Sequence, residues 1–331
     1  MTVLSICIPT YNRASLLNEC LLAIYNTKCN FLDFEVCVSD NASTDDTFSI
    51  VDSFKKYKNF SYERNDTNLG IPLNFLKVVS IAKGKYVWLL GDDDIITTDA
   101  IQQILKKIQL NESADFFLFN CLNFKKRDIS KSFKNDKESI FWTSKFSGPC
   151  KFADILEKNI TFDHLGGMYL SVFNRSLWDG AINALDPEKI RVKTQFSSHD
   201  NTFPHVRIFA KAFMGRNAYV SPNIICHSFS DTREWHPYFP MIRTFRLLES
   251  LDVYKEYGMN IVSYKKLRNK TLDYFIEDFI KVFFLKRSYK GHAYFSKREV
   301  LIENIKYFGF WASFVSLIFR MAKKIIKQFK R

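Results

Sequence analysis

The sequence predicts an α/β fold in which a mostly parallel central sheet carries helices on both faces and is followed by a C-terminal helical region. In the first 120 residues, short apolar runs alternate with segments whose apolar residues recur at helical spacing, the pattern of β-α units. From Met241 onward the chain reads as helices only. At 331 residues the chain is also long for a single core. We therefore expect two units, residues 1–235 and residues 236–331.

The expected elements follow one another through short loops. Val3–Pro9 is a continuous apolar run that ends at a proline, which predicts a buried first strand, and Ala14–Tyr25 has leucines at helical spacing. The same alternation predicts strands at Phe34–Ser39, Phe60–Glu63, Lys85–Leu90 and Phe116–Asn120, with helices at Asp46–Lys56, Pro72–Ala82 and Asp99–Ile108. Further strands are expected at Met168–Phe173 and Ala218–Cys226, and a helix from Asp200 to Phe213.

Positive charge is concentrated near the C-terminus. The net charge is +13, and from Lys281 to Arg331 thirteen Lys and Arg face two Glu. This basic segment is interleaved with apolar runs and has no zinc-knuckle or helix-turn-helix spacing, which favours an anionic lipid surface over nucleic acid as its partner. The longest apolar run, Gly309–Phe319, is too short to cross a bilayer, which takes about 20 apolar residues. We expect peripheral membrane contact.

An apolar stripe in the same segment predicts an amphipathic helix. Its residues recur at alternating spacings of four and three. Six of the twelve residues from Arg320 to Arg331 are basic, and each basic side chain near an anionic leaflet contributes about 1 kcal/mol. Packing of the stripe on the N-terminal unit, or in the seam of a homodimer, stays open as an alternative. The stripe consists of Leu301, Ile305, Phe308, Trp311, Val315, Ile318, Ala322, Ile325 and Phe329.

The cysteines and the N-terminus predict a cytoplasmic protein. Seven cysteines are scattered without a C-x-x-C pair, which argues against a disulfide framework or a structural zinc site. Val3–Ile8 has no positively charged segment before it and is soon followed by Pro9, so we interpret it as a strand and not a signal peptide. Together with the basic tail, this places the protein at the inner face of the cell membrane.

Polar residues gather directly after the predicted strands, where parallel sheets bind ligands. The strand Lys85–Leu90 is followed by Gly91 and then by Asp92-Asp93-Asp94. Three adjacent carboxylates need a positive partner, and oxygen ligands suit Mg²⁺ or Mn²⁺, which can bridge a diphosphate. The triplet therefore predicts a metal-diphosphate site, with a solvated turn that caps the next helix as the alternative. Neither the dinucleotide-binding fingerprint nor the P-loop is present.

Four motifs stand in a fixed order along the first hundred residues. They are Ile6-Cys7-Ile8-Pro9-Thr10-Tyr11-Asn12-Arg13, Asp40-Asn41-Ala42-Ser43-Thr44-Asp45-Asp46-Thr47, Asn68-Leu69-Gly70 and Asp92-Asp93-Asp94. Together they resemble the family 2 glycosyltransferases with the GT-A fold, in which the acidic triplet is the DXD motif. The resemblance covers roughly residues 1–230.

The resemblance implies a donor site built by the loops after the strands. Thr10, Tyr11 and Arg13 would line the nucleotide. Asp40 would contact the base, accepting the imino proton of a uracil or thymine ring, with a helix N-cap as the alternative role. Asn68 would lie close to the nucleotide or serve only as a turn residue. The remaining implied ligands are Asp92 and Asp93 on the nucleotide side, and Asp92, Asp94 and His227 at the metal or diphosphate.

The resemblance also implies a general base and an acceptor side. Asp200, in Ser198-His199-Asp200-Asn201, stands where the family has a Glu-Asp pair whose Asp is the base, although His199 here replaces the Glu. An N-cap role is the alternative for Asp200. Gly166 and Gly167 resemble the acceptor-side loop, and Trp235 offers an aromatic face to a sugar ring.

We expect an inverting glycosyltransferase that uses Mg²⁺ or Mn²⁺ and moves a sugar from a nucleoside diphosphate sugar, with a UDP-sugar as the expected donor. The expected acceptor is a hydroxyl of a lipid-linked glycan in surface polysaccharide (O-antigen or capsule) synthesis, and no nucleic acid is expected as a partner. One alternative is a nucleotidyltransferase, although Thr10–Arg13 lacks the usual glycine- and lysine-rich loop. The other is a non-catalytic scaffold that docks on membranes.

Overall fold

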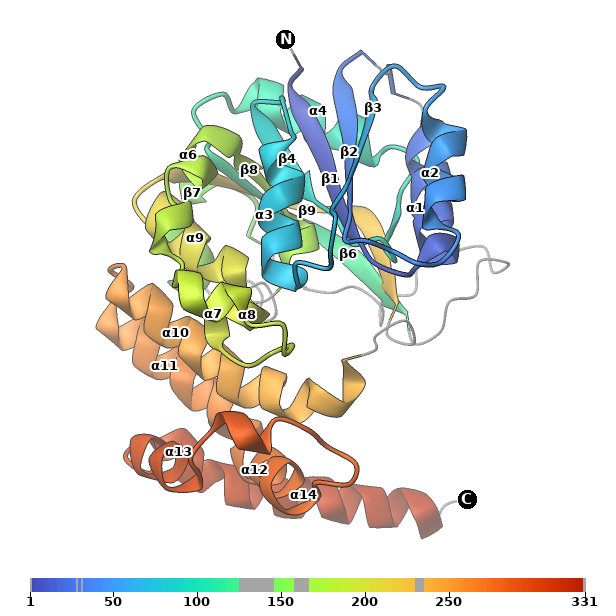
Figure 1. Ribbon diagram of the computed structural model, residues 1–331. Coiled ribbons are helices and arrows are strands. Elements are labelled where there is room, and N and C mark those ends of the chain that lie inside the picture. The colour runs from blue at the N-terminus through green and yellow to red at the C-terminus, as the bar shows by residue number, and fades with distance from the viewer. Residues whose placement is uncertain are drawn as a thin grey trace.

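A mixed sheet forms the centre of the catalytic unit in the computed structural model (Figure 1). The structure describes residues 2–27, 29–30, 32–124, 146–157, 167–229 and 235–329. Within these residues the strand order is β3-β2-β1-β4-β8-β6-β9-β5, and β7 also pairs with β9. The strands are β1 (Leu4–Thr10), β2 (Phe34–Asp40), β3 (Phe60–Arg64), β4 (Tyr86–Leu89), β5 (Ile95–Ile96), β6 (Phe116–Phe124), β7 (Gly148–Lys151), β8 (Ser171–Asn174) and β9 (Asn217–Phe229).

The predicted mostly parallel sheet is confirmed. Strand β1 is parallel to β2 and β4, β2 is parallel to β3, and β6 is parallel to β9. Strand β8 lies antiparallel between β4 and β6, so β6 and β9 run in the same direction as β1 to β4. Every residue of β1, β2 and β4 is buried, because helices cover both faces, which explains why these strands read as continuous apolar runs. Their carboxyl ends meet at one edge, where Thr10 and Asp40 are register partners.

Helices flank the sheet, with α3 in front of it and α4 behind it in Figure 1. Those of the catalytic unit are α1 (Ala14–Tyr25), α2 (Thr47–Phe54), α3 (Ile71–Ser80), α4 (Ala100–Leu110), α5 (Phe152–Glu157), α6 (Arg175–Asp179), α7 (Pro187–Arg191), α8 (His199–Thr202) and α9 (Pro204–Phe213). The C-terminal region has a π-helical turn (Met241–Arg246) that runs into α10 (Leu247–Glu256), then α11 (Ile261–Thr271), α12 (Phe275–Phe284), α13 (Lys297–Asn304) and α14 (Phe308–Phe329).

Two expected elements differ from the structure. The helix predicted from Asp200 to Phe213 is divided at Phe203, because Pro204 has no N–H to continue the helix and restricts the residue before it. The strand predicted from Met168 begins only at Ser171. Residues Met168–Leu170 form a 3₁₀ turn, and the carbonyl of Tyr169 accepts a hydrogen bond from Trp88 Nε1 at 2.7 Å.

The C-terminal helices lie beyond the carboxyl edge of the sheet, with α10 and α11 nearest to it and α12 to α14 farther out (Figure 1). The predicted amphipathic helix is divided into α13 and α14 by a break at residues 305–307. Helix α14 packs inward through Phe310 and Ser313, and Gly309 lies so close to α11 that a Cβ there would be 2.2 Å from the carbonyl oxygen of Asn269.

The predicted apolar stripe faces outward. Phe308, Trp311 and Ile318 are 78%, 55% and 67% exposed. Val315 and Ile325 are also exposed, so these residues do not pack on the rest of the protein, whereas Leu301 at the start of the stripe packs against the core. No helix in the described ranges has both the length and the apolar content needed to span a membrane.

Candidate active site

The acidic triplet forms a buried turn after β4. Asp92 and Asp94 are only 5% and 4% exposed. Thr10 Oγ1 at the end of β1 donates a hydrogen bond to Asp92 Oδ2 at 2.8 Å, and Arg13 Nη1 lies 2.7 Å from Asp92 Oδ1. Helix α4 begins only at Ala100, with Asp99 at its N-cap. The alternative of a solvated turn that caps the next helix is therefore wrong.

The charge of the turn is partly compensated by Arg13, which also lies 3.2 Å from Asp93 Oδ2. Burial nevertheless raises the pKa of Asp92 to about 6, with the guanidinium of Arg13 opposing and the charge of Asp93 reinforcing the rise. The turn is thus an electrostatically unfavourable place for one more negative charge. It is favourable for an added cation.

The residues around the turn fit a divalent cation. Gly91 allows the carboxylates to fold back over the backbone, since a Cβ at this position would lie 2.9 Å from Asp94 Oδ2 and 3.0 Å from Asp93 Oδ1. Ile95, the residue after Asp94, pairs with His227 in the β5–β9 ladder. Burial lowers the pKa of His227, which favours the neutral, ligating imidazole. Carboxylate oxygens are the donors that Mg²⁺ and Mn²⁺ prefer. Among the described residues, however, no three His, Cys, Asp or Glu side chains already converge as a metal-binding group.

The loops after β1 and β2 are held against each other. Asn12 Oδ1 accepts a hydrogen bond from the Thr44 N–H at 2.7 Å, and the Asn12 N–H donates to Ser43 Oγ at 2.8 Å. Asn12 (φ 52°) and Ala42 (φ 64°) both adopt the left-handed conformation, which asparagine tolerates better than alanine. Tyr11, the residue before Asn12 in the first loop, is exposed. Asn12 stands inside the first motif, but the sequence alone did not predict this role for it.

Asp40 is fully buried at the end of β2. Its carboxylate accepts hydrogen bonds from the Ser43 N–H and from Tyr62 Oη, each at 2.9 Å, and Arg64 Nε lies at 3.4 Å. Helix α2 begins at Thr47, so Asp40 does not cap it. Asp40 orders the second loop, and its carboxylate is not accessible to a base in this conformation.

Asn68 belongs to a network of amides that joins the third loop to the second. Asn68 Oδ1 accepts from Asn41 Nδ2 at 2.9 Å and from the Gly70 N–H at 2.8 Å, while Asn41 Oδ1 accepts from the Leu69 N–H. Asn74, buried in α3, hydrogen-bonds Ser39 in β2. Asn41 and Asn74 were missed because an isolated amide gives no signal until its partner is known.

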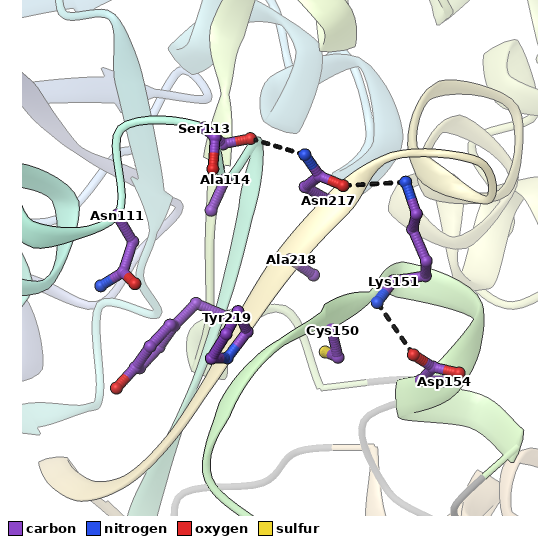
Figure 2. Close-up of a pocket in the computed structure, with 10 residues that line it drawn as sticks. Asn111, Ser113, Ala114, Cys150, Lys151, Asp154, Asn217, Ala218 and Tyr219 are labelled. Carbon is purple, nitrogen blue, oxygen red and sulfur yellow. Dashed lines mark hydrogen bonds between the residues drawn. The ribbon is translucent and has the colours of Figure 1, made fainter.

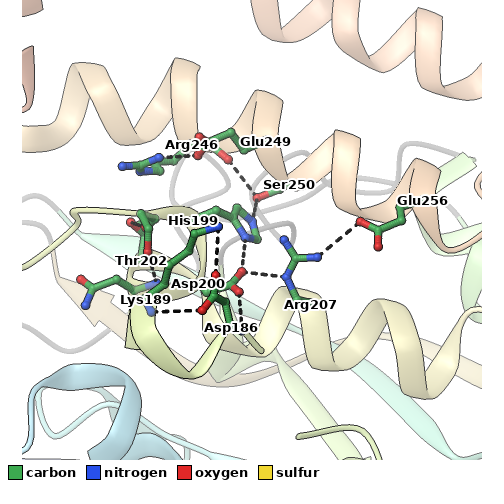
Figure 3. Close-up of polar contacts among 12 residues, drawn as sticks. Asp186, Lys189, His199, Asp200, Thr202, Arg207, Arg246, Glu249, Ser250 and Glu256 are labelled. Carbon is green, nitrogen blue, oxygen red and sulfur yellow. Dashed lines mark hydrogen bonds and ion pairs between the residues drawn. The ribbon is translucent and has the colours of Figure 1, made fainter. Parts of the chain in front are cut away.

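Asp200 lies in the first turn of α8 and is 2% exposed. Its carboxylate contacts Arg207 Nε at 2.8 Å, the Asp186 N–H at 3.1 Å and His199 Nδ1 at 3.2 Å (Figure 3). Burial alone would raise the pKa of Asp200, but the hydrogen bonds from His199 and Arg207 outweigh it and lower the pKa well below the ordinary range. The N-cap of α8 is Ser198, so the alternative N-cap role of Asp200 is wrong.

The Asp200 cluster reaches the C-terminal helices. His199 Nε2 lies 3.1 Å from Ser250 Oγ in α10, and Arg207 Nη1 lies 3.4 Å from Glu256 Oε2 at the end of the same helix (Figure 3). The sequence gives no indication of these pairs, because their members stand about fifty positions apart. A cavity of about 380 Å³ adjoins Asp200 and Arg207.

The acceptor-side residues are placed only in part. Gly166 lies outside the described residues, and Gly167 precedes the 3₁₀ turn Met168–Leu170. The ring centroid of Trp235 lies 5.8 Å from that of Phe239. A second cavity, of about 410 Å³ and shown in Figure 2, lies where β6 and β9 begin and is lined by Tyr219 and Lys151. It is at the opposite end of these strands from the acidic turn.

Comparison with known proteins identifies the class. The family described as glycosyl transferase family 2 matches residues 5–168. Abequosyltransferase RfbV of Salmonella typhimurium is 31% identical over 244 residues, which cover 70% of this chain and 68% of that protein. The GalNAc(5)-diNAcBac-PP-undecaprenol beta-1,3-glucosyltransferase of Campylobacter jejuni is 30% identical over 54% of this chain and 53% of its own length. The chain therefore belongs to family 2 of the glycosyltransferases and is an enzyme of that class.

Solved structures show the same fold. S. aureus TarS 1-349 in complex with UDP superposes with a TM-score of 0.60 at 17% identity, covering 86% of this chain and 75% of that one. Mannosyltransferase PcManGT from Pyrobaculum calidifontis, in complex with GDP-Man and Mn²⁺, has a TM-score of 0.53 at 17% identity, covering 97% and 86%. The predicted GT-A fold is confirmed.

The raised pKa of Asp92 makes stability depend on pH. Its pKa of about 6 in the folded chain exceeds the ordinary 3.8, so its contribution to stability is full below about pH 4 and is lost as the pH rises through 6. Without metal, we expect the stability of Asp92→Asn relative to wild type to increase by on the order of 3 kcal/mol from pH 4 to pH 7. Calorimetric unfolding measures this change, with Asp99→Asn in the same segment as the control. A difference that does not change with pH would contradict the assignment.

Proposed function

We propose that this enzyme transfers a sugar, with inversion, from a nucleoside diphosphate sugar to a hydroxyl of a lipid-linked glycan in surface polysaccharide synthesis. The expected donor is a UDP-sugar, bound with Mg²⁺ or Mn²⁺. The observation that carries this proposal is the buried Asp92, held between Thr10 and Arg13 where β1 and β4 end. The relatives support it, since one is an abequosyltransferase and another acts on a PP-undecaprenol glycan.

The donor would lie across the loops after β1, β2 and β4. Tyr11 offers an exposed ring to the base, and Arg13 has a guanidinium that can move from Asp92 and Asp93 to the diphosphate. Asp92, Asp94 and His227 would hold the cation, which when bound neutralises the leaving diphosphate. Among the structural neighbours, TarS has been solved with UDP and with UDP-GlcNAc, and PcManGT with Mn²⁺.

Asp200 would act as the base that removes the proton of the acceptor hydroxyl. Its carboxylate is ionised at neutral pH and is oriented by hydrogen bonds from Arg207 and His199, although the same bonds lower its pKa and thus its basicity. A single displacement assisted by one base inverts the configuration at the anomeric carbon. Because the chain is a member of family 2, neither the nucleotidyltransferase nor the scaffold alternative is retained.

Helix α14 would hold the enzyme at an anionic lipid surface, on the cytoplasmic side. The helix is fixed to the body through its polar side, where Arg320 Nε donates to Glu277 Oε2 at 2.9 Å and Arg320 Nη1 to Asp273 Oδ2 at 3.1 Å. The stripe that contains Trp311 and Ile318 is left exposed. An outward apolar face that runs into a basic segment matches an interfacial helix better than a helix of the core.

Nucleotide binding tests the acidic turn. We expect calorimetric titration of UDP to give binding with Mn²⁺ present and none with chelator, and we expect Asp94→Asn to weaken binding by at least about tenfold, because a carboxylate ligand is lost. Asp99→Asn, five residues further along, serves as the matched control. The same titration with GDP and dTDP identifies the base. Binding that is indifferent to both chelator and Asp94→Asn would refute the metal site.

Sugar transfer tests the base. We expect Asp200→Asn to lower turnover by about 10²–10⁴-fold, the range for general base catalysis, while UDP binding with Mn²⁺ stays unchanged. Transfer is followed as UDP release in the presence of a lipid-linked glycan fraction. Asp179→Asn in α6 is the matched control, and melting temperatures establish that each variant is folded. Near-normal turnover of folded Asp200→Asn would show that another group is the base.

Vesicle binding tests the outward stripe. We expect Ile318→Glu to weaken sedimentation with phosphatidylglycerol vesicles by about tenfold or more, since burial of such a side chain contributes about 1.5–3 kcal/mol, and we expect binding to fall with added salt. Leu110→Glu, an equally exposed site at the end of α4, is the control. If Ile318→Glu instead changes a concentration-dependent mass in sedimentation and leaves vesicle binding intact, the stripe is a dimer seam.

A further inference from the structure

The cavity beside Asp200 is built jointly by the catalytic unit and the C-terminal helices. Ser197 and Asp200 line one side, and Arg246 and Val253 line the other. Its volume of about 380 Å³ falls within the range of small-molecule sites. Charged side chains of both signs stand in its wall, among them Lys189, Arg207, Glu249 and Glu256 (Figure 3). Mixed charges that pair with one another suit a neutral ligand that both donates and accepts hydrogen bonds.

Two atoms in the wall retain unused hydrogen-bonding capacity. Ser197 Oγ and Arg246 Nε are buried and have no hydrogen-bond partner within the described parts of the chain. Arg246 is itself only 2% exposed, and its other nitrogens contact Glu249 Oε2 at 2.5 Å and the Phe196 carbonyl at 2.9 Å. A buried polar group without a partner is costly, so in a native protein it indicates an ordered water or a ligand.

The backbone on both sides of the cavity adopts uncommon conformations. Phe196, next to Ser197, has φ 62°, which a bulky residue rarely adopts. Arg246 ends the π-helical turn Met241–Arg246, and such turns are frequent at functional sites. The hydrogen bond from Arg246 Nη2 to the Phe196 carbonyl joins the two. Strain of this kind persists where the surroundings impose it, typically at a binding or catalytic site.

We propose that this cavity binds a neutral, hydroxyl-rich sugar unit of the acceptor, with Ser197 and Arg246 as the residues that recognise its hydroxyl groups. The inference rests on the proposed function, because it sets the acceptor sugar beside Asp200. Ser197 Oγ can donate to or accept from a hydroxyl, and Arg246 Nε can only donate. Through Arg246, the C-terminal helices take part in the choice of acceptor.

Saturation-transfer NMR tests the subsite without requiring turnover. The probes are octyl glucoside, galactoside, mannoside and N-acetylglucosaminide at millimolar concentration. We expect wild type to bind at least one of them, Ser197→Ala to weaken that binding by about twofold to tenfold, as for one neutral hydrogen bond, and Ser197→Tyr to abolish it by filling the cavity. Ser53→Ala removes an exposed hydroxyl from α2 and is the matched control.

Titration of UDP with Mn²⁺ in the same samples separates the two proposals. If wild type binds UDP but none of the four glycosides, or if Ser197→Ala binds the glycoside as tightly as wild type, the subsite is refuted and the proposed function stands. If wild type does not bind UDP, the proposed function is refuted, and the acceptor role of the subsite is refuted with it. Ser197→Ala should stay folded, since it removes a hydroxyl without a partner, so the test holds even if Ser197→Tyr does not fold.

Discussion

The site depends on the burial of carboxylates beside arginines, and this arrangement occurs twice. Asp92 is paired with Arg13, and Asp200 with Arg207. Their pKa values are shifted in opposite directions. Burial raises the pKa of Asp92 and the charge of Asp93 reinforces the rise, whereas hydrogen bonds from His199, Arg207 and the Asp186 N–H outweigh the burial of Asp200. In the proposed function, Asp92 would help to hold the cation and Asp200 would stay ionised beside the acceptor. The environment, and not the residue type, separates their roles.

The central sheet can be predicted from the sequence because its signals are local. Strands β1, β2 and β4 are buried on both faces and read as apolar runs, and the polar motifs follow them directly. Pro204 is itself a signal for a break in the helix, but the prediction followed the apolar spacing from Asp200 to Phe213. Arg207 and Ser250, which hold the Asp200 cluster, gave no local signal. Their roles come from tertiary contacts that periodicity cannot report.

The C-terminal stripe shows a second feature that apolar spacing alone cannot predict. The apolar spacing correctly indicated an amphipathic helix, but spacing does not reveal which face packs. Phe310 is buried against the body, Gly309 and Ser313 permit the close approach, and Arg320 bonds Asp273 and Glu277, so one apolar ring and several small or polar groups hold the helix. Most of its other large apolar side chains, among them Trp311, Val315 and Ile318, are left outward, unlike those of an ordinary core helix. Only the structure could distinguish these two arrangements.

We propose Asp200 as the base, and contacts from α10 and the turn before it join the C-terminal helices directly to the Asp200 cluster. Ser250 is the partner of His199 Nε2, and Arg246 is the partner of the Phe196 carbonyl, so both atoms would lose these bonds without the helices. A strained Phe196 persists only where its surroundings fix it, and Arg246 supplies part of that support. Orientation of Asp200 therefore depends on a helix that begins after the catalytic sheet is complete. The outward stripe of α14 belongs to the same helical region. This region therefore contacts the Asp200 cluster and also carries the stripe that we expect to face the lipid surface, where the acceptor would lie.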